Sequence, residues 1–138
     1  MTLEELKTRV IFQVNADEDD LDDYEPALTG YINRGYDRLL WALLEKHLPD
    51  GGFVALGAVT DVPKVPEWTH GVLADFATYL VYRNGNPQKQ SRGERFLQSF
   101  MEVEQQLKQL AGRIESYDDE TGEFTFRKDP PQFYHVYP

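Results

Sequence analysis

The 138-residue sequence contains no cysteine, which excludes a disulfide framework and any thiolate zinc site. Long hydrophobic runs are missing as well. The longest apolar stretches, "LLWALL" and "VALGAV", fall far below the roughly 20 residues that a membrane helix needs. The first residues, "MTLEELKTRV", include no apolar stretch of signal-peptide length. We therefore expect a soluble protein without an export signal of its own.

Residues that support nucleophilic or phosphate chemistry are scarce. The only serines are Ser91, Ser99 and Ser116, and none lies in a nucleophile-elbow pattern. No glycine-rich stretch is followed by the lysine of a phosphate-binding loop. Paired carboxylates are numerous, but they lie in acidic segments where burial would not raise a pKa. The sequence predicts no enzymatic activity and no cofactor, and a small-molecule enzyme would need a buried polar pocket with convergent carboxylates.

The net charge of -10 is placed unevenly along the chain. Residues 1–25 carry nine acidic and two basic residues, and residues 115–138 carry six acidic and two basic residues. Residues 26–114 are nearly neutral, with ten basic and nine acidic residues. Two acidic ends repel phosphate backbones, so we expect no specific nucleic-acid binding. The short apolar runs predict no membrane association.

Hydrophobic periodicity predicts four helices. Thr2 and Glu5 have the spacing of a capping box, so a first helix is expected to follow and to end near Val14. Its apolar face consists of Leu3, Leu6, Val10 and Val14. An acidic loop, "NADEDDLDDYE", is expected next. A second, strongly amphipathic helix then has Pro26 in its first turn and Lys46 and His47 at its negative end, and "LPDGG" stops it.

The third helix is expected from Pro66 to about Arg83, and the fourth from Pro87 to about Arg113. The third is apolar on most sides, and Trp68 is one of its apolar residues. Such a pattern is typical of the central helix of a bundle. The turn "RNGNP" between the two helices contains a glycine that can end one helix and a proline that can begin the next. So short a connection predicts that the third and fourth helices pack antiparallel.

The remaining segments predict little regular structure. Residues 53–65 are β-branched and apolar, and either a short hairpin or an extended loop fits them. Residues 115–128 alternate around a glycine-containing turn and predict a β-hairpin. Residues 129–138 contain three prolines and predict an extended tail. The predicted fold is one mainly α domain, residues 1–138, with a four-helix core over residues 1–114, one or two short β-hairpins and this carboxyl-terminal tail.

Two patterns resemble metal sites, and both fail in detail. The acidic loop lacks the glycine and glutamate of an EF-hand when counted from Asn15, and it offers Leu21 in place of an oxygen ligand when counted from Asp17. Glu67 and His70 have the spacing of a di-iron helix, but no second such pair exists. We therefore predict no metal site, a solvated acidic loop that precedes the second helix, and a surface or capping role for His70.

Two segments are candidates for partner contacts. The first is the basic elbow between the third and fourth helices, with Arg83, Lys89, Arg92 and Arg95. It could contact an acidic partner surface or nucleic acid, or it could be a solvated turn whose charges complement the helix dipole. Nearby Tyr79 and Tyr82 are predicted to be core residues and not a base-stacking platform. The second is the tail, where aromatic groups need a surface to cover them, either on this domain or on a partner: Phe133, Tyr134 and Tyr137.

Two stretches of the chain resemble the helical head–tail connector (adaptor) proteins of tailed bacteriophages. The first is "DDLDDYEPALTGYINRGYDRLL", an acidic start followed by a long amphipathic helix. The second is "VPEWTHGVLADFATYLVYRNGNPQKQSRGERFLQSFMEVEQQL", with a proline-led apolar helix, a short turn and a helix that begins with basic residues. Together the resemblance covers residues 19–47 and 66–111.

This resemblance implies a mainly helical virion subunit without enzymatic activity, which contributes no catalytic residue. It implies a homo-oligomeric ring between portal and tail, with the portal and tail-completion proteins as partners. The location would be the virion, and the cytoplasm of a bacterial host during assembly. An alternative is a prophage-encoded regulatory or interaction module that acts through the acidic amino-terminal segment. A gene neighbourhood of portal, capsid and tail-completion genes would distinguish the connector from the regulator.

Overall fold

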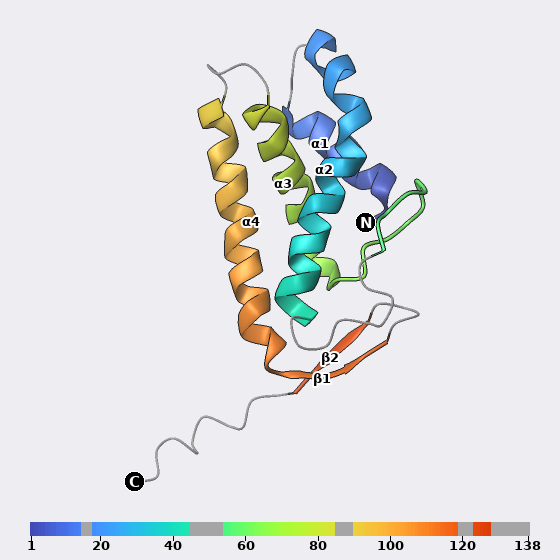
Figure 1. The fold of residues 1–138 in the computed structure, drawn as a ribbon, viewed down its shortest axis with the longest axis vertical. Coiled ribbons are helices and arrows are strands. Elements are labelled where there is room, and N and C mark those ends of the chain that lie inside the picture. Colours follow the sequence, from blue (N-terminus) through green and yellow to red (C-terminus); the bar gives the residue numbers. More distant parts are fainter. Residues whose placement is uncertain (15–17, 45–53, 85–89, 119–122, 128–138) are drawn as a thin grey trace.

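A computed structural model of the chain describes residues 1–14, 18–44, 54–84, 90–118 and 123–127 (Figure 1). These residues form four α-helices and one small antiparallel sheet, which confirms the predicted, mainly α fold class. The elements are α1 (Leu3–Val14), α2 (Glu18–Leu44), a 3-10 helix η1 (Glu67–Thr69), α3 (His70–Arg83), α4 (Gln90–Ala111), β1 (Ile114–Tyr117) and β2 (Phe124–Phe126).

The first helix begins where the capping-box pattern places it. The backbone N–H of Glu5 donates to the Thr2 hydroxyl oxygen at 3.2 Å, and the Thr2 N–H donates to the Glu5 carboxylate at 3.3 Å. Two further N–H groups of the first turn, those of Leu3 and Glu4, donate to the carbonyls of Asp61 and Val59. The start of α1 is therefore fully capped, half by its own side chains and half by a distant segment.

That distant segment, residues 54–66, settles the choice between hairpin and loop in favour of the loop. It contains no strand, because its backbone groups bond to α1, to α2 and within a turn of the loop, where the Asp61 N–H donates to the Ala58 carbonyl at 2.9 Å. Leu56 exchanges two hydrogen bonds with the Asn33 side chain of α2, at 2.7 and 2.9 Å. The Lys64 N–H donates to the Tyr36 hydroxyl at 3.0 Å. The loop is thus fixed across the start of α1 and the middle of α2.

The second helix begins earlier than the sequence predicts. It starts at Glu18, so Pro26 lies inside the helix and not in its first turn. Proline removes one backbone hydrogen bond, but the carboxylates that precede it are favoured at the positive end of the helix dipole. The predicted boundary between an acidic loop and a helix is therefore wrong for residues 18–25. Its expected basic end, at residues 46 and 47, lies outside the described residues.

Helix α3 is the central element, as its apolar character predicts. It packs against α1, α2 and α4, while α2, α3 and α4 run along the long axis of the molecule and α1 crosses behind them (Figure 1). Two predictions for its start are wrong. Trp68 is 53% exposed and His70 only 3% exposed, because the chain forms η1 there and turns His70, not Trp68, towards the interior.

The third and fourth helices pack antiparallel, as predicted (Figure 1). Their crossing is close at Gly93, where an added Cβ would lie 2.9 Å from the Tyr82 Cβ and 3.3 Å from the Tyr79 carbonyl oxygen. Further along α4, Phe100 is fully buried and its ring centroid lies 4.6 Å from that of Phe76. The remaining buried apolar residues belong to the same core and include Leu28, Ile32, Leu39, Leu43, Leu73, Leu80 and Leu107.

A polar network lies between α1 and α3. The Gln13 amide donates to the Asp75 carboxylate at 2.7 Å and accepts from the Thr78 hydroxyl at 2.7 Å. Thr78 is fully buried, and burial raises the pKa of Asp75, although the hydrogen bond from Gln13 and the charge of Arg9 oppose this rise. The interface therefore combines an apolar face with polar groups that satisfy one another.

The predicted carboxyl-terminal hairpin is confirmed. Strands β1 and β2 pair with Ile114 opposite Phe126 and Tyr117 opposite Phe124, with an irregularity after Ile114. The hairpin lies across one end of the bundle (Figure 1), where the Tyr117 and Phe124 rings stack at 4.5 Å. The predicted tail, residues 129–138, lies outside the described residues.

Candidate interaction surfaces

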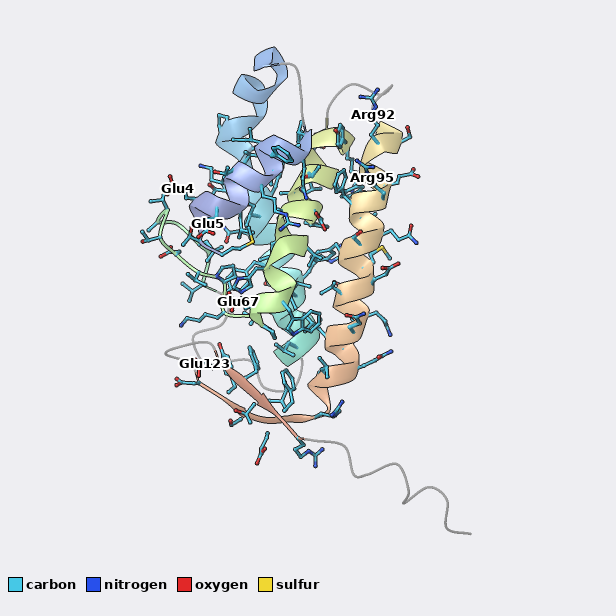
Figure 2. The ribbon with its side chains drawn as sticks, turned by 180° about the vertical axis from the view of Figure 1, so that it is seen from behind. Glu4, Glu5, Glu67, Arg92, Arg95 and Glu123 are labelled. Carbon is cyan, nitrogen blue, oxygen red and sulfur yellow. The ribbon has the colours of Figure 1, made fainter. Side chains whose placement is uncertain are left out.

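Of the four residues in the predicted basic elbow, the structure brings two together. Arg92 and Arg95 project from the first turns of α4 (Figure 2). They line a recess of about 420 Å³ together with Gln13, Val14, Tyr82 and Ser91. We call this surface the basic recess. Arg83 is exposed at the end of α3 and borders a different groove, and Lys89 lies outside the described residues.

The arginines of the basic recess have no carboxylate partner in the described part of the chain. Among the described residues, the ion pair that forms joins Arg38 to Glu104 at 2.8 Å, away from the recess. The Arg95 guanidinium lies 4.8 Å above the Phe96 ring, and Phe96 in turn stacks with Tyr82. Stacking positions one face of Arg95 and leaves its N–H groups able to bind an acceptor.

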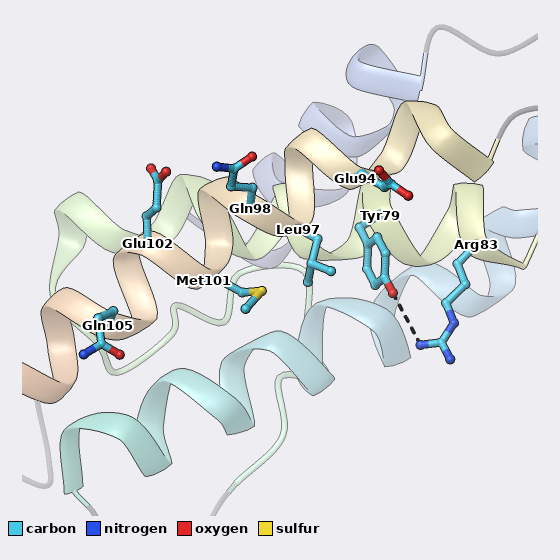
Figure 3. Close-up of a pocket in the computed structure, with 8 residues that line it drawn as sticks. All are labelled: Tyr79, Arg83, Glu94, Leu97, Gln98, Met101, Glu102 and Gln105. Atoms are coloured by element: carbon cyan, nitrogen blue, oxygen red, sulfur yellow. Dashed lines mark hydrogen bonds between the residues drawn. The ribbon is translucent and has the colours of Figure 1, made fainter.

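Tyr82 and Tyr79 are half-buried, so the prediction that both are core residues is only partly right. The Tyr82 hydroxyl donates to the Val14 carbonyl at 3.1 Å. The Tyr79 ring borders a groove of about 830 Å³ that runs along α4 (Figure 3). The two rings therefore face different surfaces and form no common stacking platform.

The groove along α4 was not found from the sequence. Leu97, Met101 and the Tyr79 ring provide its apolar surface, and Met101 is half exposed. Its polar border comes from Arg83, Glu94, Gln98, Glu102 and Gln105 (Figure 3). The spacing of Leu97 and Met101 is a signal that could have shown it, because residues four apart share one side of a helix.

A third cleft, of about 620 Å³, lies between the 54–66 loop and β2 and includes His70. The His70 Nδ1 lies 2.8 Å from the amino group of Met1, and its Nε2 lies 2.9 Å from the Val65 carbonyl oxygen. Burial lowers the pKa of His70. A neutral ring that accepts at Nδ1 and donates at Nε2 satisfies both contacts, so His70 is an internal bridge and not the predicted surface residue.

The cleft around His70 does not have the composition of a metal centre. Glu67 and Glu123 lie at its border (Figure 2), but no group of three or more metal-ligating side chains occurs among the residues that the structure describes. Asp61, whose pKa is lowered by hydrogen bonds from the backbone of Gly57 and Ala58, closes a turn of the loop. Asp61 therefore has a structural role.

The other predicted contact segments are the carboxyl-terminal tail and the acidic residues 18–25. Phe133, Tyr134 and Tyr137 of the tail lie outside the described residues. For residues 18–25 the structure gives the helical backbone, which is the start of α2. Within the described ranges no helix is long and apolar enough to cross a membrane.

Comparison of the chain with family models, with curated protein sequences and with solved structures gives no match.

Proposed function

We propose that this protein is a structural subunit of a tailed-bacteriophage head–tail connector, where copies form a ring between the portal and the tail. The resemblance of residues 19–47 and 66–111 to the adaptor proteins supports the proposal. The helical fold is compatible with it. Virion and host cytoplasm are the locations that follow, with portal and tail-completion proteins as partners.

The observation that carries the proposal is the pair of separate surfaces on α4. The basic recess at its start and the groove around Tyr79, Leu97 and Met101 are both exposed. They differ in chemistry, because one is cationic and the other is apolar with a polar border. A subunit inside a ring has at least two unlike neighbouring surfaces to contact, and one helix offers both.

The direct test is coexpression with the portal protein encoded in the same gene cluster. We expect the two proteins to copurify, and negative-stain images to show a ring of this chain on one face of the portal. A double substitution in the groove, Leu97→Glu with Met101→Glu, should abolish copurification. Glu115→Gln, an exposed position in β1 outside the groove, is the control. A chain that stays monomeric in the presence of the portal, or a cluster without portal genes, contradicts the proposal.

The acidic start of α2 supports one second candidate, the regulatory or interaction module. Six of the eight residues from 18 to 25 are acidic, and such a segment can bind a basic partner surface. A solitary gene beside a promoter, together with saturable binding of a basic protein encoded nearby, would favour this function over the connector.

A further inference from the structure

We propose that neighbouring copies contact each other through opposite charge, with the basic recess of one copy against the acidic start of α2, residues 18–25, of the next. This inference rests on the proposed connector function and specifies how its subunits meet. It involves two surfaces of one chain and no other molecule.

The basic side of this contact is preformed. Arg92 and Arg95 are three residues apart on one helix, and both line the same recess. Neither forms an ion pair with another described residue. Guanidinium groups bind carboxylates through two parallel hydrogen bonds, which makes them suited to an acidic helix. The recess also contains the Ser91 hydroxyl, while the Gln13 amide at its edge is held by Asp75 and Thr78.

The acidic side carries an excess of one charge. Residues 18–25 contain six acidic residues and no basic one, and they form the first turns of α2. Carboxylates three and four apart on a helix repel each other. The helix dipole favours the first of them, but its effect ends within about one turn. A cationic surface from outside would relieve the repulsion among the rest.

The position of the two sides explains why the contact is between copies. The start of α2 and the start of α4 lie at the same end of the bundle, with α3 between them in both views (Figures 1 and 2). Because α3 separates the two sites, each is available to a different copy. A contact between unlike surfaces of identical chains is head-to-tail, and such a contact forms a ring when its rotation closes.

Nucleic acid is the competing occupant of the basic recess. Glu94 lies between the two arginines in the sequence, and the chain as a whole carries a net charge of -10. The acidic start of α2 lies at the same end of the molecule (Figure 1) and repels a phosphate backbone there. The same residues attract the recess of another copy, so the charge pattern favours a protein contact.

Two charge-reversed variants of the full chain test the contact. One is Arg92→Glu with Arg95→Glu. The other replaces Asp19, Asp20, Asp22 and Asp23 with lysine, which leaves two acidic and four basic residues between 18 and 25. We expect wild-type self-association, measured by sedimentation velocity, to be strong in about 25 mM salt and weak in about 500 mM, where charges are screened within a few ångströms. Each variant alone should remain monomeric, and an equimolar mixture of the two should associate again. Circular dichroism establishes that each variant is folded.

The control variant, Arg34→Glu with Lys108→Glu, makes the same change in net charge as the arginine variant, at exposed positions outside the recess, and it should associate as wild type does. The same variants are scored for ring formation on the portal. Rings that survive both reversals overturn this contact and leave the connector function standing. Wild-type chains that form no ring with the portal overturn both. Failure of the mixture to associate, or duplex DNA binding by wild type that the arginine reversal removes, overturns the contact alone.

Discussion

Replacing Gly93 with alanine should destabilise this protein, although alanine is the better helix former. An interior glycine normally costs a helix about 1 kcal/mol relative to alanine. At Gly93 the new Cβ would meet the Tyr82 Cβ at 2.9 Å and the Tyr79 Cα at 3.4 Å. Neither atom can rotate away, and carbon atoms pack best at about 3.5–4.0 Å. The two helices must therefore separate by about 0.6 Å, and overpacking of this kind costs about 1–3 kcal/mol.

Gly30→Ala is the matched control, because no atom lies within 4 Å of its added Cβ and the residue is exposed within α2. It should stabilise the protein by about 0.5–1 kcal/mol. Gly93→Ala should lower the free energy of unfolding by about 1 kcal/mol, since the gain in helix propensity offsets part of the strain. Urea denaturation of both variants gives the comparison. If Gly93→Ala raised stability as much as Gly30→Ala, the close crossing of α3 and α4 would be refuted.

Three further predictions concern the core, the titration of His70 and calcium. Leu80→Asp buries a carboxylate in the core, so the free energy of unfolding should drop by more than about 3 kcal/mol. Met101→Asp, at a half-exposed site, should change it by less than about 1 kcal/mol. An unchanged thermal transition for Leu80→Asp would contradict the placement of α3 in the core. The pKa of His70 is lowered in the folded state, so the unfolded chain binds the proton more tightly. The contribution of His70 to the free energy of unfolding should therefore be fully present above about pH 6.5 and fall by at most about 1.4 kcal/mol per pH unit below it. His70→Gln should flatten that slope in urea titrations at pH 7.5 and 5.5, and a slope that is the same in both proteins would contradict the assignment. Millimolar calcium should leave the melting temperature unchanged, since both EF-hand alignments of the acidic segment fail, and a rise of several degrees would show a cation site there.

The parts of the fold that local sequence determines were predictable. Thr2 and Glu5 are three residues apart and form the capping box, and the spacing of Leu3, Leu6 and Val10 places all three in the core. In these cases the interacting groups are close in sequence, so periodicity and cap chemistry identify them. The predicted start of α2 is wrong because it relies on one local signal. Pro26 usually marks the first turn of a helix, but here the acidic residues before it are helical as well.

The candidate surfaces depend on residues far apart in sequence. His70 is buried because Met1 and Val65 bond to its two nitrogens, and nothing near residue 70 indicates this. The α4 groove joins Tyr79 to Leu97 and Met101 across two helices. The basic recess requires the end of α1 beside the start of α4. Such arrangements are set by tertiary packing, so helical periodicity could identify the contributing helices but not the surfaces between them.

The polar network between α1 and α3 contributes to the choice among several positions that α1 could take along α3. Leu3, Leu6, Val10 and Val14 recur nearly every turn, so this apolar face would still be covered if α1 moved by one turn along α3. Such a slip would carry Gln13 about 5 Å away from Asp75 and Thr78 and leave a carboxylate and a buried hydroxyl unsatisfied. The apolar residues hold α1 against the bundle, and Gln13 fixes its register together with the hydrogen bond from Tyr82 to the Val14 carbonyl and those from the Leu3 and Glu4 N–H groups to the loop.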